Sequence, residues 1–155
     1  MKRTFLLFFL FSSLQGFALE LGLSLQYLVP NRLPDFQIPL TAFGPQIAVP
    51  ISGNEVNLQV LYGGNSGGSE TVSLYLAESS YNIKIPTPFF TAFFLGGVHY
   101  IHYGYLGNDH EFFGPVAGLG FDFPMAKQFQ MGMGMKAYLT RKVMLALGGS
   151  FAFIL

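Results

Sequence analysis

The sequence is short of charge. Only 10% of its 155 residues are Asp, Glu, Lys or Arg, and the eight basic residues balance the eight acidic ones. Soluble domains carry about 25% charged residues because a water-facing surface needs them. A soluble fold of this composition would expose large apolar patches. The zero net charge and the lack of basic runs also argue against a nucleic-acid-binding surface.

Cysteine is absent, which excludes disulfides, thiolate metal sites, cysteine nucleophiles and a lipid-modified cysteine. Long apolar helical runs are missing too, because Gly, Pro, Asn and Gln interrupt every apolar stretch after residue 18. Aromatic residues are abundant. The 18 Phe and 8 Tyr are far too many for a disordered chain. A strongly apolar chain without a spanning helix can satisfy its backbone in a membrane by closing a β-barrel.

The first 18 residues have the pattern of a secretory signal. Lys2 and Arg3 precede an apolar run over residues 5–11, and the small residues Gly16 and Ala18 follow at the spacing of a cleavage site. The run is much shorter than the ~20 residues of a spanning helix, so an N-terminal anchor is the less favoured alternative. We predict a signal peptide at residues 1–18 and a barrel domain at residues 19–155.

Alternation with a period of two predicts the strands. In the two clearest segments, 19–29 and 129–139, odd-numbered positions are apolar and even-numbered positions are mostly polar or small. Each covers about 11 residues, which suits a tilted strand that crosses a bilayer. Weaker alternation marks five further segments, at residues 43–51, 56–62, 72–77, 113–123 and 143–155, and their apolar positions are expected to face outward.

The stretch from Phe89 to Tyr105 is apolar on both faces and is assigned one strand, whose outward face the alternation does not settle. The predicted fold is therefore all-β, an eight-stranded antiparallel up-and-down transmembrane β-barrel. Within segment 78–88 the alternating Tyr81, Ile83 and Ile85 leave a strand extension open. Outer loops are expected at 30–42, 63–70, 106–111 and 140–142, and inner turns at 52–55, 78–88 and 124–127.

The polar face of the alternation carries Gly, Ser, Ala, Gln and Asn with few charges, which suits a cramped interior better than a solvated exterior. The apolar face is therefore predicted to contact lipid, and a soluble secreted barrel is the less favoured alternative. Aromatic residues at the strand ends of the apolar face predict two girdles at the membrane interfaces. The outer girdle comprises Tyr27, Phe43, Tyr62 and Phe113, and the inner girdle Phe123, Phe129, Phe151 and Phe153.

Together, the leader, the eight segments and the Gly-rich GPVAGLGFDFP from Gly114 to Pro124 resemble the small outer-membrane β-barrels of Gram-negative bacteria, the OmpA/OmpX-like barrels. The resemblance spans the predicted mature chain as a pattern and includes no diagnostic motif. Members usually end in an aromatic residue. This chain has Phe151 and Phe153 at apolar positions of its alternating last segment, but it ends in Leu155. The resemblance implies an outer-membrane location, with outer-membrane lipids and the outer-membrane assembly machinery as partners. We expect a monomer that binds no nucleic acid.

The lumen of an eight-stranded barrel is just wide enough for side chains to fill. We predict a nearly bare wall over the last three strands and the first, with Leu61, Tyr75 and the strand 89–105 leaning across from the opposite wall. A narrow apolar cavity for a lipid tail or small ligand is the alternative. The glycines of the wall are Gly114, Gly118, Gly120, Gly132, Gly134 and Gly148.

Three charged residues, Glu20, Asp122 and Lys136, are predicted to point into the lumen. Unpaired charges there would be costly, so we expect Lys136 to pair with Asp122 or with Glu20.

No catalytic, metal or cofactor motif is found. Five titratable residues near the predicted outer rim match no ligand spacing: His99, His102, Asp109, His110 and Glu111. The leading interpretation is a non-enzymatic barrel with a structural or surface-interaction role and a largely filled lumen. The alternatives are a barrel that binds a lipid or other apolar ligand, a very narrow pore, and a lipid-modifying enzyme that uses rim histidines with loop Ser66 or Ser69.

Overall fold

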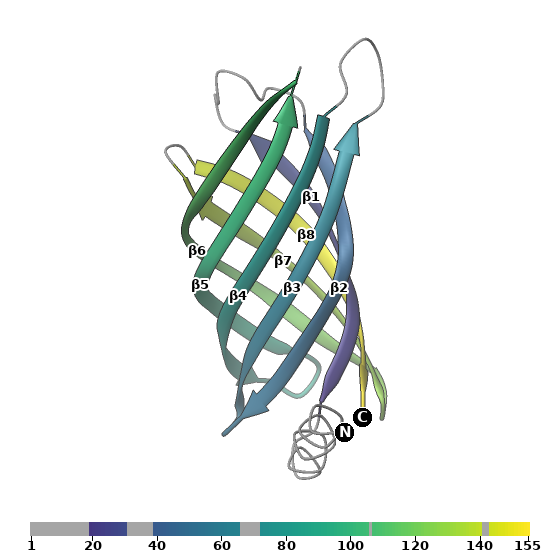
Figure 1. Cartoon of the computed structure of the whole chain (residues 1–155). Coiled ribbons are helices and arrows are strands. Elements are labelled where there is room, and N and C mark those ends of the chain that lie inside the picture. Colours follow the sequence, from purple (N-terminus) through teal and green to yellow (C-terminus); the bar gives the residue numbers. More distant parts are fainter. Residues whose placement is uncertain (1–18, 31–38, 66–71, 106, 141–142) are drawn as a thin grey trace, which may run out of the picture.

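The computed structural model describes residues 19–30, 39–65, 72–105, 107–140 and 143–155. Eight antiparallel strands follow one another around a closed barrel, in which β1 pairs with β8 (Figure 1). The predicted eight-stranded up-and-down barrel is confirmed. The predicted signal peptide at 1–18 lies outside the described residues. The strands are β1 (Glu20–Pro30), β2 (Leu40–Ile51), β3 (Asn54–Asn65), β4 (Val72–Pro86), β5 (Thr91–Tyr105), β6 (Asn108–Ala126), β7 (Phe129–Leu139) and β8 (Val143–Ile154). The described part of the chain includes no helix long and apolar enough to cross a membrane.

Residues 19 and 155 lie at the same end of the barrel (Figure 1), which we call the proximal end; the opposite end is the distal end. The backbone N–H of Leu155 donates to the carbonyl of Leu19 over 2.9 Å. The connection between β2 and β3 is also proximal, and it consists of Ser52 and Gly53. Both have positive φ, 51° and 84°, as in the two-residue turns whose twist matches a hairpin.

Several predicted connections are too long. The inner turn at 78–88 is wrong, because β4 continues to Pro86 and only residues 87–90 connect it to β5. The outer loop at 106–111 is also wrong, because β6 begins at Asn108. Four other predicted connections also include residues that belong to strands in the structure. They are the loops at 30–42 and 63–70 and the turns at 52–55 and 124–127. Strand pairing extends these ladders beyond the segments in which the apolar alternation is clear.

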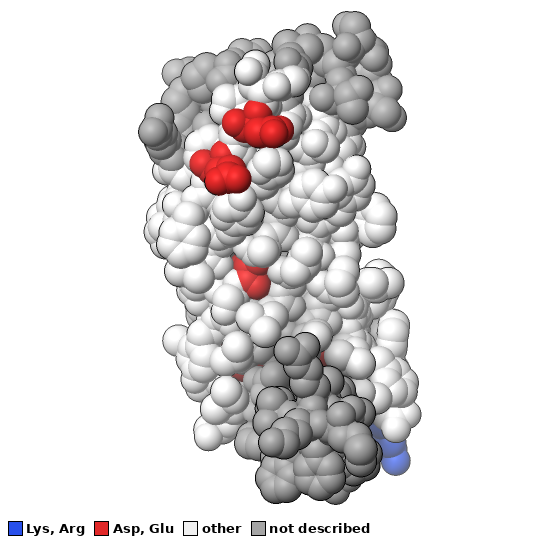
Figure 2. All heavy atoms as spheres, viewed as in Figure 1, with Lys and Arg blue, Asp and Glu red and all other residues white. Residues whose placement is uncertain are grey.

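The outer face of the barrel is a belt of exposed apolar side chains that includes residues of all eight strands. Leu23 is 64% exposed, Phe43 62% and Val60 57%, although all three are apolar. Figure 2 shows how few charged residues reach one side of this surface. A belt of this extent is incompatible with water as the surrounding solvent and suits acyl chains.

The distal half of the lumen is filled by a cluster of buried apolar side chains, which we call the apolar plug. Its members come from all eight strands, and all of them are at most 3% exposed. They are Leu28, Leu40, Leu61, Val72, Leu74, Leu76, Ile101, Tyr103, Val116, Tyr138 and Met144.

The orientation predicted for the start of β4 is wrong. Val72, Leu74 and Leu76 point into the plug, and Tyr75 lies on the outer face with 52% of its surface exposed. The reason is that the distal half of the lumen is itself apolar. Apolar residues there do not mark the lipid-facing side of the strand.

Candidate functional site: the barrel lumen

The sequence alternation did not settle which face of β5 points outward. In the structure, Phe93, Leu95 and His99 of β5 point into the lumen. Each of the three lies opposite a glycine of β6 in the antiparallel ladder. The pairs are Phe93 with Gly120, Leu95 with Gly118 and His99 with Gly114.

These glycines leave no room for a side chain. A Cβ atom added to Gly120 would lie 2.5 Å from Phe93 Cζ, and one added to Gly118 would lie 3.2 Å from Leu95 Cγ. At Gly132 the obstacle is polar, since the added atom would lie 2.5 Å from Ser150 Oγ and 2.9 Å from Asp122 Oδ1. Backbone oxygens crowd the added atom at Gly134 and Gly148 as well, at 2.8 and 2.9 Å. Large side chains and bare backbone therefore fit together across the ladder.

Lys136 points into the lumen, where its Nζ donates to both carboxylate oxygens of Glu78 over 2.7 and 3.0 Å. The expected pairing with Asp122 or Glu20 is wrong. Lys136 lies opposite Gly118 in the β6–β7 ladder, four residues along β6 from Asp122, which is about 13 Å at the rise of a strand. Glu78, in contrast, reaches across the lumen from β4.

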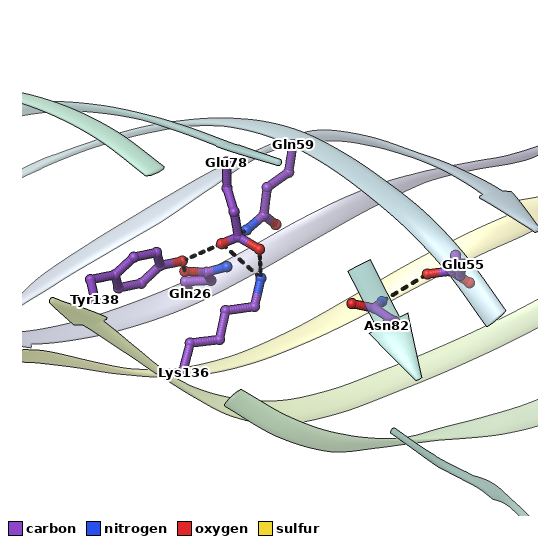
Figure 3. Close-up of polar contacts among 7 residues, drawn as sticks. All are labelled: Gln26, Glu55, Gln59, Glu78, Asn82, Lys136 and Tyr138. Carbon is purple, nitrogen blue, oxygen red and sulfur yellow. Dashed lines mark hydrogen bonds and ion pairs between the residues drawn. The ribbon is translucent and has the colours of Figure 1, made fainter. Parts of the chain in front are cut away.

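Glu78 is the centre of a buried polar cluster just proximal to the plug, which we call the Glu78 network (Figure 3). Besides Lys136, the carboxylate accepts a hydrogen bond of 2.6 Å from Gln59 Nε2 and one of 2.8 Å from the Tyr138 hydroxyl. The same hydroxyl lies 2.7 Å from Gln26 Oε1. A hydroxyl has only one proton to donate. If the Gln26 amide is rotated, its NH₂ group donates to the Tyr138 hydroxyl while that hydroxyl donates to Glu78.

A second polar region lies nearer the proximal end and surrounds a small cavity of about 60 Å³. Lys84 contacts Glu55 and lies 3.5 Å from Asp122 Oδ2, and Asn82 Nδ2 donates to Glu55 Oε1 over 2.9 Å. We call this region the proximal chamber. Its polar lining includes Glu20, Glu55, Asn57, Asn82 and Asp122.

The rim residues are divided between the two faces of the β5–β6 hairpin. His99 is 1% exposed inside the barrel, edge-on to the Tyr138 ring at 5.0 Å. On the outer face, His102 approaches Glu111 and Asp109, at 3.6 and 3.9 Å between the nearest nitrogen and oxygen atoms. Among the described residues, no group of three or more His, Asp or Glu side chains is arranged to hold a metal ion. Ser66 and Ser69 lie outside the described residues.

The residues predicted for the girdles lie on the outer face. At the distal end, Phe43 pairs with Tyr62 across β2 and β3, and the Tyr62 ring lies 5.0 Å from that of Tyr75. At the proximal end, the Phe129 and Phe151 rings are stacked at 6.1 Å. Tyr27, Phe113 and Phe153 are also exposed, and Phe123 is half-buried.

Sequence reasoning missed three lumen charges: Glu55, Glu78 and Lys84. The signal was present in segment 78–84, where Glu78, Ser80, Asn82 and Lys84 occupy every second position. Polar residues at every second position, with Tyr81 and Ile83 between the later ones, predict a strand with a polar inner face, as the structure shows.

No protein-family model matches this sequence, and no curated protein matches it. Solved structures do match the fold. Neisserial surface protein A (NspA) superposes with a TM-score of 0.65 at 13% identity, over 90% of this chain and 97% of NspA. Ail of Yersinia pestis, crystallised with the heparin analogue sucrose octasulfate, gives a TM-score of 0.61 at 9% identity, over 88% and 97% of the two chains. A major outer membrane protein of Thermus thermophilus gives 0.58 at 14% identity, over 88% and 99%.

The chain therefore has the fold of the small eight-stranded outer-membrane β-barrels. The likeness to OmpA/OmpX-like barrels expected from the sequence is confirmed at the level of the fold.

Proposed function

We propose that this protein is a non-enzymatic, monomeric β-barrel of the outer membrane whose lumen is closed, with a role in envelope structure or surface interaction. The observation that carries the proposal is the apolar plug, in which Leu28, Leu61 and Leu74 are fully buried at the distal end. Ions cross an apolar constriction poorly because no polar group replaces their hydration shell. Outer-membrane lipids would surround the exposed apolar belt, and the outer-membrane assembly machinery would insert the barrel.

The cavity volume favours this role over the binding of an apolar ligand in the lumen. The proximal chamber has about 60 Å³ and walls that mix polar and apolar side chains, whereas pockets for drug-sized ligands measure about 300–1,000 Å³ and are mostly apolar. The described lumen therefore offers little support for a bound lipid tail.

A surface-interaction role places recognition at the distal end. Charges on the outer face of the described distal rim include Asp109 and Glu111, whose side chains are 74% and 66% exposed. Ail was crystallised with a sulfated heparin analogue, but acidic side chains repel sulfate. We therefore favour a partner with a neutral or basic surface.

Planar-bilayer recording tests the closed lumen. The purified mature chain is expected to give no steady ion conductance, and the double variant Leu61→Ala/Leu74→Ala, which empties the plug, is expected to conduct. The matched control is Leu58→Ala/Leu145→Ala, which shortens two leucines on the outer face (47% and 52% exposed) and should stay silent. Steady conductance of the unaltered protein, equal to that of the plug variant, would overturn the proposal.

A further inference from the structure

We propose that the proximal chamber binds a small inorganic cation that enters from the proximal end of the barrel. This site is separate from the apolar plug. The proposal needs the closed barrel fold but not a silent lumen, so its test and the conductance test can fail independently.

The charges that line the proximal chamber are not balanced. Glu20, Glu55 and Asp122 line the chamber, and each of the three is at most 7% exposed. Lys84 contacts two of them, Glu55 and Asp122, while Lys136 is already paired with Glu78. Three carboxylates against one ammonium group leave two negative charges on buried side chains. Such charges are costly unless a counter-charge joins them.

Two amide oxygens in the lining of the proximal chamber lack hydrogen-bond donors. Oδ1 of Asn82 is buried without a hydrogen-bond donor, although the residue is only 4% exposed and lines the chamber. Its amide cannot be reversed, because its Nδ2 donates to Glu55 (Figure 3) and reversal would set oxygen against oxygen. Oδ1 of Asn57, also in the lining, lacks a donor too. Buried acceptors without donors indicate a missing partner.

The chemistry of these groups identifies the class of ligand. The unsatisfied groups are carboxylate and amide oxygens, which are the ligands of hard cations such as Ca²⁺ and Mg²⁺. A divalent ion would also match the two excess charges. The carboxylates are not arranged to hold a metal by themselves, so the amide oxygens and retained water would complete its shell. A volume of about 60 Å³ holds an ion with a few waters.

An entry path is present at the proximal end. The side chains of Lys84 and Asp122 keep 15% and 10% of their surface accessible, and both lie near the proximal ends of their strands. Ions can therefore reach the chamber without passing the apolar plug.

The test measures the thermal unfolding of the refolded mature chain in detergent, first in EDTA and then with increasing CaCl₂, at an ionic strength held constant with choline chloride. The proposal predicts a saturable rise of several degrees in the unfolding midpoint. Mg²⁺, Na⁺ and K⁺ are titrated in the same way, and a saturable response to any one of them supports the site. No saturable response to any of the four cations would overturn the proposal.

The double variant Glu20→Gln/Asp122→Asn removes the two excess charges. It should lose the cation response and, in EDTA, unfold at a higher temperature than the unaltered protein. Asp109→Asn, at the exposed rim, is the matched control and should respond as the unaltered protein does. Equilibrium dialysis of the unaltered protein with the cation that gives the response (⁴⁵Ca²⁺ in the case of calcium) is independent of the variant's folding and should find one ion per chain. A response that persists in the double variant, or binding of no ion, would contradict the chamber as the site.

Discussion

At the scale of single residues, large side chains of β5 fill space in the lumen that glycines of β6 leave free. Each of these large residues lies opposite a glycine in the β5–β6 ladder. Leu95 lies opposite Gly118. A Cβ added there would meet the backbone oxygen of Met135 on β7 first, and it would lie 3.2 Å from Leu95 Cγ. A larger residue at Gly118 would find no free space. Its side chain would have to displace either Leu95 or the backbone of the neighbouring strand.

Gly118→Leu should therefore lower the free energy of unfolding by about 1–3 kcal/mol, and a second substitution, Leu95→Ala, should restore part of the loss. Urea titration in detergent micelles measures both effects. Gly96→Leu is the control, because Gly96 lies on the outer face with no atom within 4 Å of an added Cβ, and it should not destabilise. Equal unfolding curves for Gly118→Leu and the unaltered protein would contradict a tightly packed wall.

The ion pair between Lys136 and Glu78 should behave as a coupled unit. Glu78 is 1% exposed at its side chain and Lys136 17%, so Lys136→Met strands a buried carboxylate and should cost about 3–5 kcal/mol. Glu78→Gln in the Lys136→Met background should recover most of this loss, since the amide needs no counter-charge. A double-mutant cycle from urea titrations measures the coupling, and additive losses would show that the pair is not coupled.

At the scale of elements, the alternation predicts the strands with a polar inner face and fails on the others. In β1 and β7, Gly and polar residues point inward along most of the strand, so period two is clear in the sequence. In the distal part of β4, Leu74 and Leu76 point inward because they belong to the plug, so the rule that apolar positions face lipid gives the opposite orientation. In β5 both faces are apolar, and only its register against the glycines of β6 identifies the inner one.

The ion pairs were beyond sequence reasoning for a related reason. Alternation tells which side chains enter the lumen, and Glu20 and Asp122 are buried there while Lys136 is half-buried. It does not give the offset between strands or the contacts across the lumen, and these decide that Lys136 binds Glu78 rather than Asp122.

The turn between β2 and β3 offers a prediction about a single element. Ser52 has a φ of 51°, a conformation that costs a residue with a Cβ about 1–2 kcal/mol. Ser52→Gly should therefore stabilise the hairpin, whereas Gly53→Val, at a φ of 84°, should destabilise it. Thermal unfolding midpoints of the two variants measure the difference, and shifts with the opposite signs would show that the turn has another conformation.

At the scale of the whole molecule, the barrel is built in three levels along its axis. The apolar plug closes the distal half, the Glu78 network lies on its proximal side, and the proximal chamber opens toward the end that holds residues 19 and 155. The outer surface carries an apolar belt around all of these levels. The proposed location and the proposed role both depend on this belt lying in acyl chains.

Spin-label accessibility in lipid vesicles tests that claim most directly. The sequence has no cysteine, so single variants Leu23→Cys, Met133→Cys and Leu147→Cys each report one outward site, with Asp109→Cys at the rim as an aqueous control. Because oxygen concentrates in acyl chains and a nickel chelate stays in water, the three belt labels should relax with oxygen and be insensitive to the chelate. The rim label should show the reverse. Belt labels as sensitive to the chelate as the rim label would contradict the account.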